Sequence, residues 1–309
     1  MTQPRQLDRI IRSAVVACAM GALIIGVGAT PAVASEPQND VEQIAALVAD
    51  VAPFQGAIER PLDNGGAGFS SSVATIPQSS AGSVVIAGET DEPLEVSLPT
   101  EVTTLDGVTT EDGTIVYSSV AGDVDVAAQA LESDKVRLQT VIQEPSAAHE
   151  FTYEILNGYT PAEAADGSLW AYRFDDNGEL DIYGVGEAWA RDATGAAVAT
   201  HYEVRGNSIV QVVTPSTDTV YPVVADPTWE WYNAAYGAGF SKAETRSLAN
   251  IGAVTGFCAA LPGAFGIACA IAGAQWFLQA GLAANANGCV FIATVPAPLA
   301  VRWLSSKCR

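Results

Sequence analysis

Residues 197–213 read AVATHYEVRGNSIVQVV, and this stretch indicates the fold class most clearly. Polar and apolar side chains alternate up to Arg205, as in a strand with one solvated face. Gly206-Asn207 is a turn signal, and an apolar run follows it. The stretch therefore predicts two antiparallel strands, Ala197–Val204 and Ile209–Val213.

The same pattern continues on the N-terminal side of this hairpin. Short strand-like runs fill residues 83–224, and no helical pattern lies between them. Turn signals separate these runs, among them Asp106-Gly107, Asp112-Gly113, Asn157-Gly158 and Asn177-Gly178. About ten such strands without helices predict an antiparallel β-sandwich. We expect this acidic β-rich domain to span residues 83–228.

The N-terminus has the pattern of a signal peptide over residues 1–34. Three arginines precede an apolar run over Ser13–Gly28, and Ala32-Val33-Ala34 is a typical cleavage site. The mature chain is expected to begin at Ser35. The sequence therefore predicts a secreted protein, located outside the cell or at its surface.

Residues 35–82 have two compositions in succession. A helical apolar spacing over Asn39–Val51, stopped by Pro53, predicts a short helix. Residues 54–82 are rich in Gly and Ser and predict a flexible linker.

Charge divides the mature chain into two parts. The 309 residues carry a formal net charge of −21, which argues against nucleic acid as a partner. Residues 35–231 hold 33 acidic and 6 basic residues, whereas residues 232–309 hold one acidic and five basic residues. Residues 247–301 contain no charged side chain at all. A separate module is therefore expected over residues 232–309.

Several segments of the β-rich part resemble a known module. They are Ala188–Gly195, Val198–Asn207, Gln211–Val213 and Tyr221–Thr228, the last reading YPVVADPT. They are similar to a β-rich module of secreted actinobacterial proteins that ends in Tyr-Pro-Val-Val-Ala-Asp-Pro. The resemblance covers roughly residues 83–228. It implies a carrier or presentation role for a variable C-terminal domain, and it implies no catalytic residue.

The C-terminal module is predicted to be a helical hairpin. Ser241-Lys242-Ala243-Glu244 is a capping box, which begins a helix expected to run to about Ala260. After Leu261-Pro262-Gly263 a second helix is expected from Ala264 to about Ala284, ended by the stop signal Asn285-Ala286-Asn287-Gly288. A short strand-like piece, Val290–Val295, and a basic tail follow.

Four cysteines of the mature chain lie in this module: Cys258, Cys269, Cys289 and Cys308. In an exported chain an even number favours two disulfides, with three possible pairings. If the two helices face each other, Cys258 pairs with Cys269, and Cys289 then pairs with Cys308. A zinc site is the alternative, but neither Cys-x-x-Cys spacing nor histidine supports it.

Other motifs give weaker signals for chemistry. The loop Asp175–Asp181 offers oxygens around a glycine, as a calcium site would, but a hairpin turn explains it better. Glu187 near Trp189 could suggest a glycosidase, and His201 with Asp192 a hydrolase triad. Neither pair comes with the rest of its constellation. We therefore predict no cofactor, no metal and no catalytic residue, and favour a protein that is not an enzyme.

The uncharged stretch leaves two functions open. The favoured one is a secreted, non-catalytic protein of the cell envelope or exterior, whose β-rich domain presents the C-terminal module for binding. The alternative is a bacteriocin-like, membrane-active module shielded by the acidic domain, because basic residues flank the apolar stretch. The partner is accordingly an unidentified envelope or membrane component, with anionic lipid as one candidate.

Overall fold

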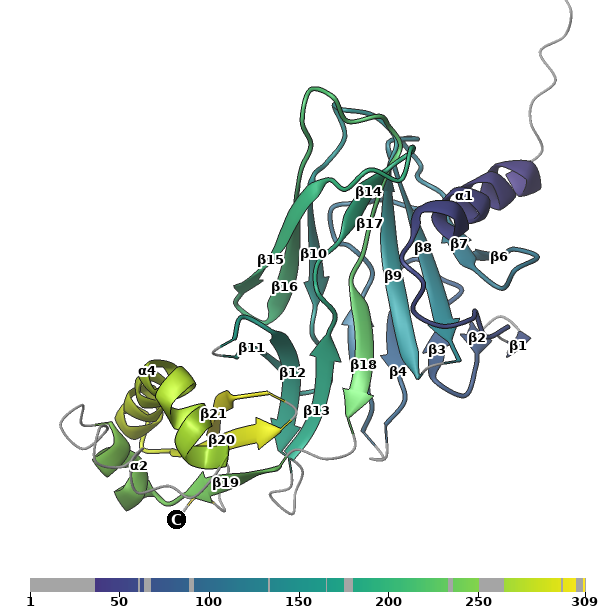
Figure 1. The fold of residues 1–309 in the computed structure, drawn as a ribbon. Coiled ribbons are helices and arrows are strands. Elements are labelled where there is room, and N and C mark those ends of the chain that lie inside the picture. Colours follow the sequence, from purple (N-terminus) through teal and green to yellow (C-terminus); the bar gives the residue numbers. More distant parts are fainter. Residues whose placement is uncertain are drawn as a thin grey trace, which may run out of the picture. The chain divides into compact units, whose positions relative to one another are not determined.

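The computed structural model describes residues 37–60, 62–63, 68–88, 92–132, 134–164, 166–174, 180–232, 236–249, 264–295, 297–303 and 308. The predicted signal peptide and most of the Asp175–Asp181 loop lie outside these residues. Contacts within Glu36–Arg309 form one compact unit. Figure 1 shows this unit.

The described residues are rich in strands, and all pairings between named strands are antiparallel. The prediction of a strand-rich, antiparallel fold is thus confirmed. A five-stranded sheet has the order β1-β2-β3-β4-β5. Its strands are β1 (Leu62–Asp63), β2 (Phe69–Ser70), β3 (Ala74–Ile76), β4 (Ser83–Ile86) and β5 (Leu94–Ser97).

A ten-stranded sheet forms the largest element, with the order β11-β12-β13-β18-β9-β8-β7-β6 and with β14 and β17 joined beside β9. Its first strands are β6 (Val108–Thr109), β7 (Ile115–Tyr117), β8 (Val124–Leu131), β9 (Lys135–Ile142) and β11 (Thr160–Glu163). The others are β12 (Leu169–Phe174), β13 (Leu180–Val185), β14 (Ala190–Asp192), β17 (Val223–Ala225) and β18 (Thr228–Tyr232).

The hairpin predicted from residues 197–213 is present. Strands β15 (Ala199–Arg205) and β16 (Ser208–Thr214) pair around Gly206-Asn207, with His201 opposite Val212. Gly206 has φ +65°, a conformation that a glycine in this tight turn adopts without strain. Together with β10 (Glu150–Glu154) these strands make a three-stranded sheet of order β10-β16-β15.

One hydrophobic core joins these three sheets. Val84 of the first sheet, Leu138 and Trp229 of the second, and Phe151 and Ile209 of the third are all fully buried in it. Alternating burial along β3, β4 and β5 shows why these segments form strands, since one face is apolar and packs inward.

The prediction of a flexible linker over residues 54–82 is wrong for its described part. Strands β1, β2 and β3 lie there, and Phe69 and Ile76 are buried in the common core. Gly68 has φ +139°, and a Cβ at this position would lie 2.5 Å from the Ile76 carbonyl oxygen. Glycine at this position therefore allows the two backbones to pack closely. The composition of residues 54–82 alone does not distinguish such a packed glycine from a glycine in a linker.

The predicted N-terminal helix is present as α1 (Pro37–Val51). Val48 and Val51 are buried against Ala127, Val141 and Val224, which belong to β8, β9 and β17. The helix therefore covers part of the ten-stranded sheet, as Figure 1 shows beside β7 and β8.

The C-terminal part differs from the predicted helical hairpin. It contains a three-stranded sheet of β19 (Tyr236–Phe240), β20 (Cys289–Val295) and β21 (Leu299–Trp303), with helices α2 (Lys242–Leu248) and α4 (Ala264–Asn285). Helix α2 ends at Leu248, far before the expected end, and residues 250–263 lie outside the described part. Gly237 of β19 lies very close to β20, because a Cβ at this position would lie 2.4 Å from the Ile292 carbonyl oxygen. Two parts of the prediction are found: α4 begins at Ala264 as expected, and the strand-like piece Val290–Val295 lies in β20.

Candidate functional site

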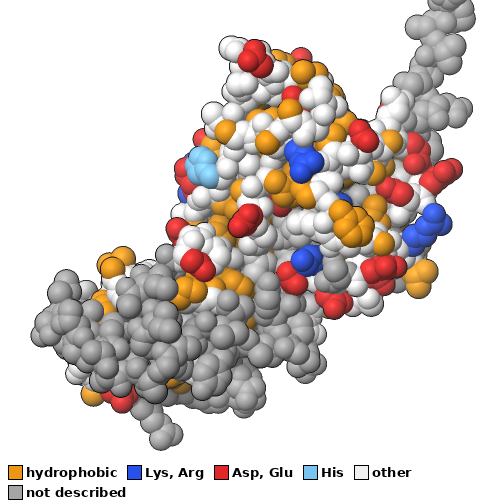
Figure 2. Space-filling model, viewed as in Figure 1, with side chains coloured by type: hydrophobic (Ala, Val, Ile, Leu, Met, Phe, Trp, Pro, Cys, Tyr) orange, Lys and Arg blue, Asp and Glu red, His pale blue; other side chains and the backbone are white. Residues whose placement is uncertain are grey.

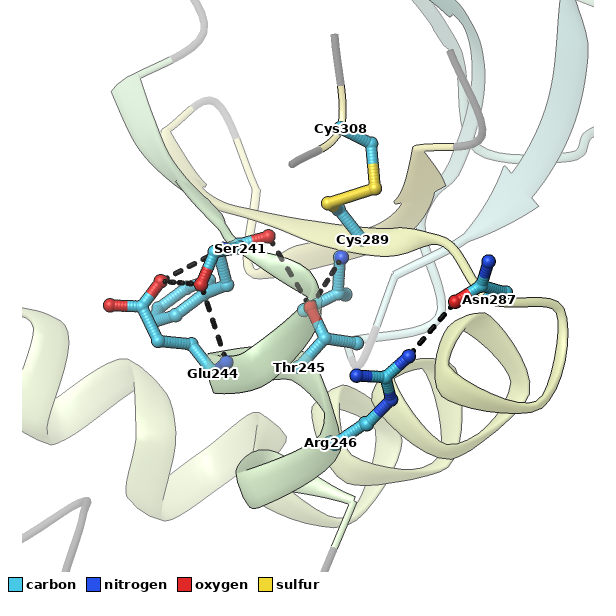
Figure 3. Close-up of a disulfide and its surroundings, with 9 residues drawn as sticks. Ser241, Glu244, Thr245, Arg246, Asn287, Cys289 and Cys308 are labelled. Atoms are coloured by element: carbon cyan, nitrogen blue, oxygen red, sulfur yellow. Dashed lines mark hydrogen bonds between the residues drawn. A yellow bond between two sulfur atoms is a disulfide. The ribbon is translucent and has the colours of Figure 1, made fainter. Parts of the chain in front are cut away.

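The C-terminal module, described at residues 236–249, 264–295, 297–303 and 308, contains a disulfide. Cys289 at the start of β20 is bonded to Cys308, with the two Cα atoms 5.6 Å apart. Figure 3 shows this bond, and both side chains are buried. Cys258 and the side chain of Cys269 lie outside the described residues. The disulfide fixes the end of the chain to the central strand of the module.

Helix α2 begins with the capping box expected from its sequence. Ser241 Oγ accepts a hydrogen bond from the Glu244 amide at 3.3 Å, and Glu244 Oε2 accepts from the Ser241 amide at 2.8 Å (Figure 3). The Ser241 hydroxyl also donates to Glu244 Oε2 at 2.7 Å, and this bond together with the one from the Ser241 amide lowers the pKa of the Glu244 carboxyl. Two amide groups that a helix end would leave unpaired are thereby satisfied.

Thr245 connects this helix to the sheet. Its side chain is fully buried, and its hydroxyl donates to the Phe240 carbonyl at 3.3 Å. The same oxygen accepts from the Val290 amide at 3.1 Å. One hydroxyl therefore joins α2 to β19 and to β20.

Helix α4 ends as its Asn-rich sequence predicts. Asn287 has φ +54°, and the amides of Asn287 and Gly288 return to the carbonyls of Ala284 and Ala283. This is a Schellman-type C-cap. Arg246 of α2 donates to Asn287 Oδ1 at 2.9 Å, so the ends of the two helices are linked (Figure 3).

The described half of α4 has one buried and one exposed apolar face. Trp276, Phe277, Ala280 and Ala283 are buried and share a core with Leu248, Val290, Ile292 and Ala300. Leu278 is 61% exposed and Leu282 is 42% exposed. These two leucines lie one turn apart, and we call them the leucine pair. This half of α4 is therefore not buried on all sides.

A second apolar cluster joins the module to the β-rich part. Trp170, Tyr172 and Ile182 of β12 and β13 share it with Leu299 and Val301 of β21. Phe174 stacks on Trp303, with ring centroids 5.4 Å apart, and meets Phe291 edge to face at 5.6 Å. Gln275 of α4 also donates to the Glu163 carbonyl of β11. The module is therefore attached through aromatic packing.

The structure describes all three catalytic candidates of the sequence, His201, Asp192 and Glu187. His201 is exposed, with its Nε2 3.3 Å from Glu203 Oε1. The Asp192 carboxylate accepts hydrogen bonds from the Thr194 hydroxyl and from the amides of Thr194, Ala196 and Val220. These bonds lower its pKa. Glu187 is exposed beside the half-buried Trp189.

Metal binding has little support within the described part of the chain. There, no three His, Cys, Asp or Glu side chains gather where they could hold a metal ion. Of the proposed calcium loop, Asp181 is described, and it is buried and accepts a hydrogen bond from the Tyr159 hydroxyl.

A buried polar cluster around Asp226 was not predicted. Asp226 Oδ1 accepts from the Trp189 amide at 3.0 Å and from the Tyr202 hydroxyl at 2.9 Å. Asp226 Oδ2 lies 3.2 Å from Thr228 Oγ1. Burial raises the pKa of Asp226 to about 7, although these hydrogen bonds and Arg137 act in the opposite direction. The sequence Ala225-Asp226-Pro227-Thr228 carries no local signal that the Asp226 carboxyl is buried.

This cluster anchors the segment after α1. Arg137, 5% exposed, donates to the Pro53 carbonyl at 2.9 Å and to Gln129 Oε1 at 2.6 Å. Thr228 Oγ1 donates to Gln55 Oε1 at 3.0 Å. Residues 53–55 are thus hydrogen-bonded to β9 and β18.

Among the helices that the structure describes, none is both long and apolar enough to cross a membrane. Comparison of the chain with protein-family models, with curated proteins and with solved structures found no match.

Proposed function

We propose that the chain is a secreted, non-catalytic protein of the cell envelope or exterior, whose β-rich part presents the C-terminal module as a binding head. The signal-peptide pattern supports export, and the resemblance of residues 83–228 to a presenting module supports the division of roles. Acidic side chains outnumber basic ones over the β-rich part in Figure 2, which favours solubility outside the cell.

The observation that carries this proposal is the leucine pair. The module packs on the β-rich part through Phe174, Phe291 and Trp303, whereas Leu278 and Leu282 remain exposed on an uncharged helix. Folded proteins bury most large apolar side chains on a helix, and an exposed group of them marks a contact surface. The leucine pair therefore fits the contact face of a binding head.

Cosedimentation of the mature protein, residues 35–309, with isolated actinobacterial cell envelopes tests the proposal. The Leu278→Ser/Leu282→Ser variant should lose most of its binding, because the apolar contact is removed. Leu105→Ser is the matched control, since Leu105 is 58% exposed on the β-rich part. Equal sedimentation of the two variants would contradict the role of the leucine pair.

A membrane-active module is the second candidate, and the uncharged stretch favours it. Residues 247–301 carry no charge, and Lys242, Arg246 and Arg302 flank them. Such a segment can lie on an anionic bilayer with its leucines inserted. Dye release from phosphatidylglycerol vesicles by the mature protein, abolished in the Leu278→Ser/Leu282→Ser variant, would favour this candidate. Envelope binding that survives lipid extraction, without dye release, would favour the binding head.

A further inference from the structure

A cavity of about 320 Å³ lies where the C-terminal module meets the β-rich part. Strands β11, β12 and β21 supply most of its wall, which consists of Gly158, Thr160, Tyr172, Arg173, Phe174, Arg302 and Trp303. A neighbouring cavity of about 160 Å³ shares Thr160, Tyr172 and Arg302 with it. The size of the larger cavity, which we call the Arg302 cavity, is at the lower end for small-molecule sites, roughly 300–1,000 Å³.

The charge of this wall is opposite to that of most of the protein. No Asp or Glu is among the described residues that line the Arg302 cavity, whereas two arginines are. Arg173 is paired with Glu92, and its Cζ lies 5.1 Å from the Tyr159 ring centroid. Arg302 is exposed, and within the described residues it makes no ion pair. Arg302 therefore supplies the positive charge available to a ligand.

The other polar groups of the wall are mainly donors. The Tyr172 hydroxyl receives a hydrogen bond from the Arg302 backbone, so its own hydrogen is left to donate. Burial raises the pKa of Tyr172, which keeps this hydrogen in place at neutral pH. Arg173 Nε and Trp303 Nε1 are buried donors that have no partner among the described atoms. A ligand with several acceptor atoms would satisfy this wall.

We propose that the Arg302 cavity binds a phosphate group. Guanidinium groups bind phosphate oxygens with paired hydrogen bonds, and a tetrahedral phosphate can accept from donors on both β12 and β21. The smaller cavity gives room for the rest of a phosphate compound, along Ala162, Val301 and Gln279. This site goes beyond the proposed function and does not depend on the leucine pair.

Titration calorimetry of the mature protein with inorganic phosphate at low salt tests this proposal. Arg302→Gln should weaken phosphate binding at least tenfold, because it removes a charged donor. Lys242→Gln is the matched control: it removes the same charge from the same module, and Lys242 lines neither cavity. Phosphate binding that is absent in the wild type, or equal in the two variants, would overturn the proposal.

A nuclear magnetic resonance signal locates the site. The indole N–H of Trp303, assigned with the Trp303→Phe variant, should shift on phosphate addition in the wild type but not in Arg302→Gln. An unmoved Trp303 signal during saturable binding would place phosphate elsewhere and overturn the proposal.

Vesicles distinguish the two sources of phosphate. If a lipid headgroup is bound, phosphatidylglycerol vesicles should sediment the wild type, and inorganic phosphate should compete. If the ligand is a free phosphate compound, phosphate binds and the vesicles do not. Either result supports the Arg302 cavity once calorimetry has shown binding, and the leucine variant should bind phosphate normally in both cases.

Discussion

At the scale of single residues, Asp226 belongs to the Tyr221–Thr228 motif and is buried in the folded protein. Its carboxyl lies in the core beside Tyr202, Thr228 and Arg137. Burial raises its pKa from 3.8 to about 7, because the charged form is poorly solvated there. The folded protein therefore holds this proton more tightly than the unfolded chain does.

This difference predicts a pH dependence of stability. The contribution of Asp226 is fully present below about pH 4 and is lost as the pH rises through about 7, by an amount on the order of 4 kcal/mol. Urea unfolding should show a smaller decrease between these pH values for Asp226→Asn than for the wild type. Parallel curves for the two proteins would contradict the raised pKa.

Thr245 gives a prediction for the C-terminal module. Thr245→Val keeps the volume but leaves the Val290 amide without its hydroxyl partner, which should cost about 1–3 kcal/mol. Ser247→Ala is the control, since Ser247 is exposed on the same helix and its hydroxyl donates to the Ala243 carbonyl of that helix. Thermal unfolding measures both. Equal midpoints would show that the Thr245 bridge contributes nothing.

At the scale of elements, composition misled the prediction where glycines allow close packing. The Gly- and Ser-rich residues 54–82 contain strands, and the Gly-containing segment Tyr236–Phe240 pairs with β20. Period-2 alternation identified the β15–β16 hairpin, and capping chemistry identified both the start of α2 and the end of α4. The strand-like piece Val290–Val295 was predicted and lies in β20, but its pairing with β19 and β21 leaves no such local signal and could not be predicted.

Gly68 tests whether the first sheet is packed as described. Gly68→Ala should destabilise the protein strongly, because its Cβ would collide with the Ile76 carbonyl as well as strain the backbone. Gly122→Ala is the control: its φ is also positive, at +78°, but nothing lies within 4 Å of the added Cβ. A Gly68→Ala variant as stable as Gly122→Ala would favour a flexible segment.

The disulfide gives a prediction at the same scale. Cys289 and Cys308 are separated by 19 residues, and closing a loop of about this length stabilises a protein by about 3 kcal/mol. The Cys289→Ala/Cys308→Ala variant should unfold at a lower midpoint in the module. Near-ultraviolet circular dichroism, to which the buried Trp276 of the module contributes, measures this midpoint. An unchanged midpoint would show that the module does not depend on this bond.

At the scale of the whole molecule, the chain combines a strand-rich acidic part with a module of different charge. Aromatic packing of Phe174 on Phe291 and Trp303 attaches the module, and the leucine pair remains exposed on α4. The sequence indicated the charge division and the unusual stretch 247–301. It could not show which face of α4 is exposed, because that depends on how the C-terminal sheet covers the other face.

Hydroxyl-radical footprinting of the mature protein on cell envelopes tests most directly whether the leucine pair is the contact face. Oxidation of Leu278 and Leu282 should decrease on binding, because their exposed side chains become covered. Leu62 and Leu105, 75% and 58% exposed on the β-rich part, should be oxidised as in the free protein. Unchanged oxidation of the leucine pair, with protection of Leu62 or Leu105 instead, would contradict the proposed presentation of the C-terminal module.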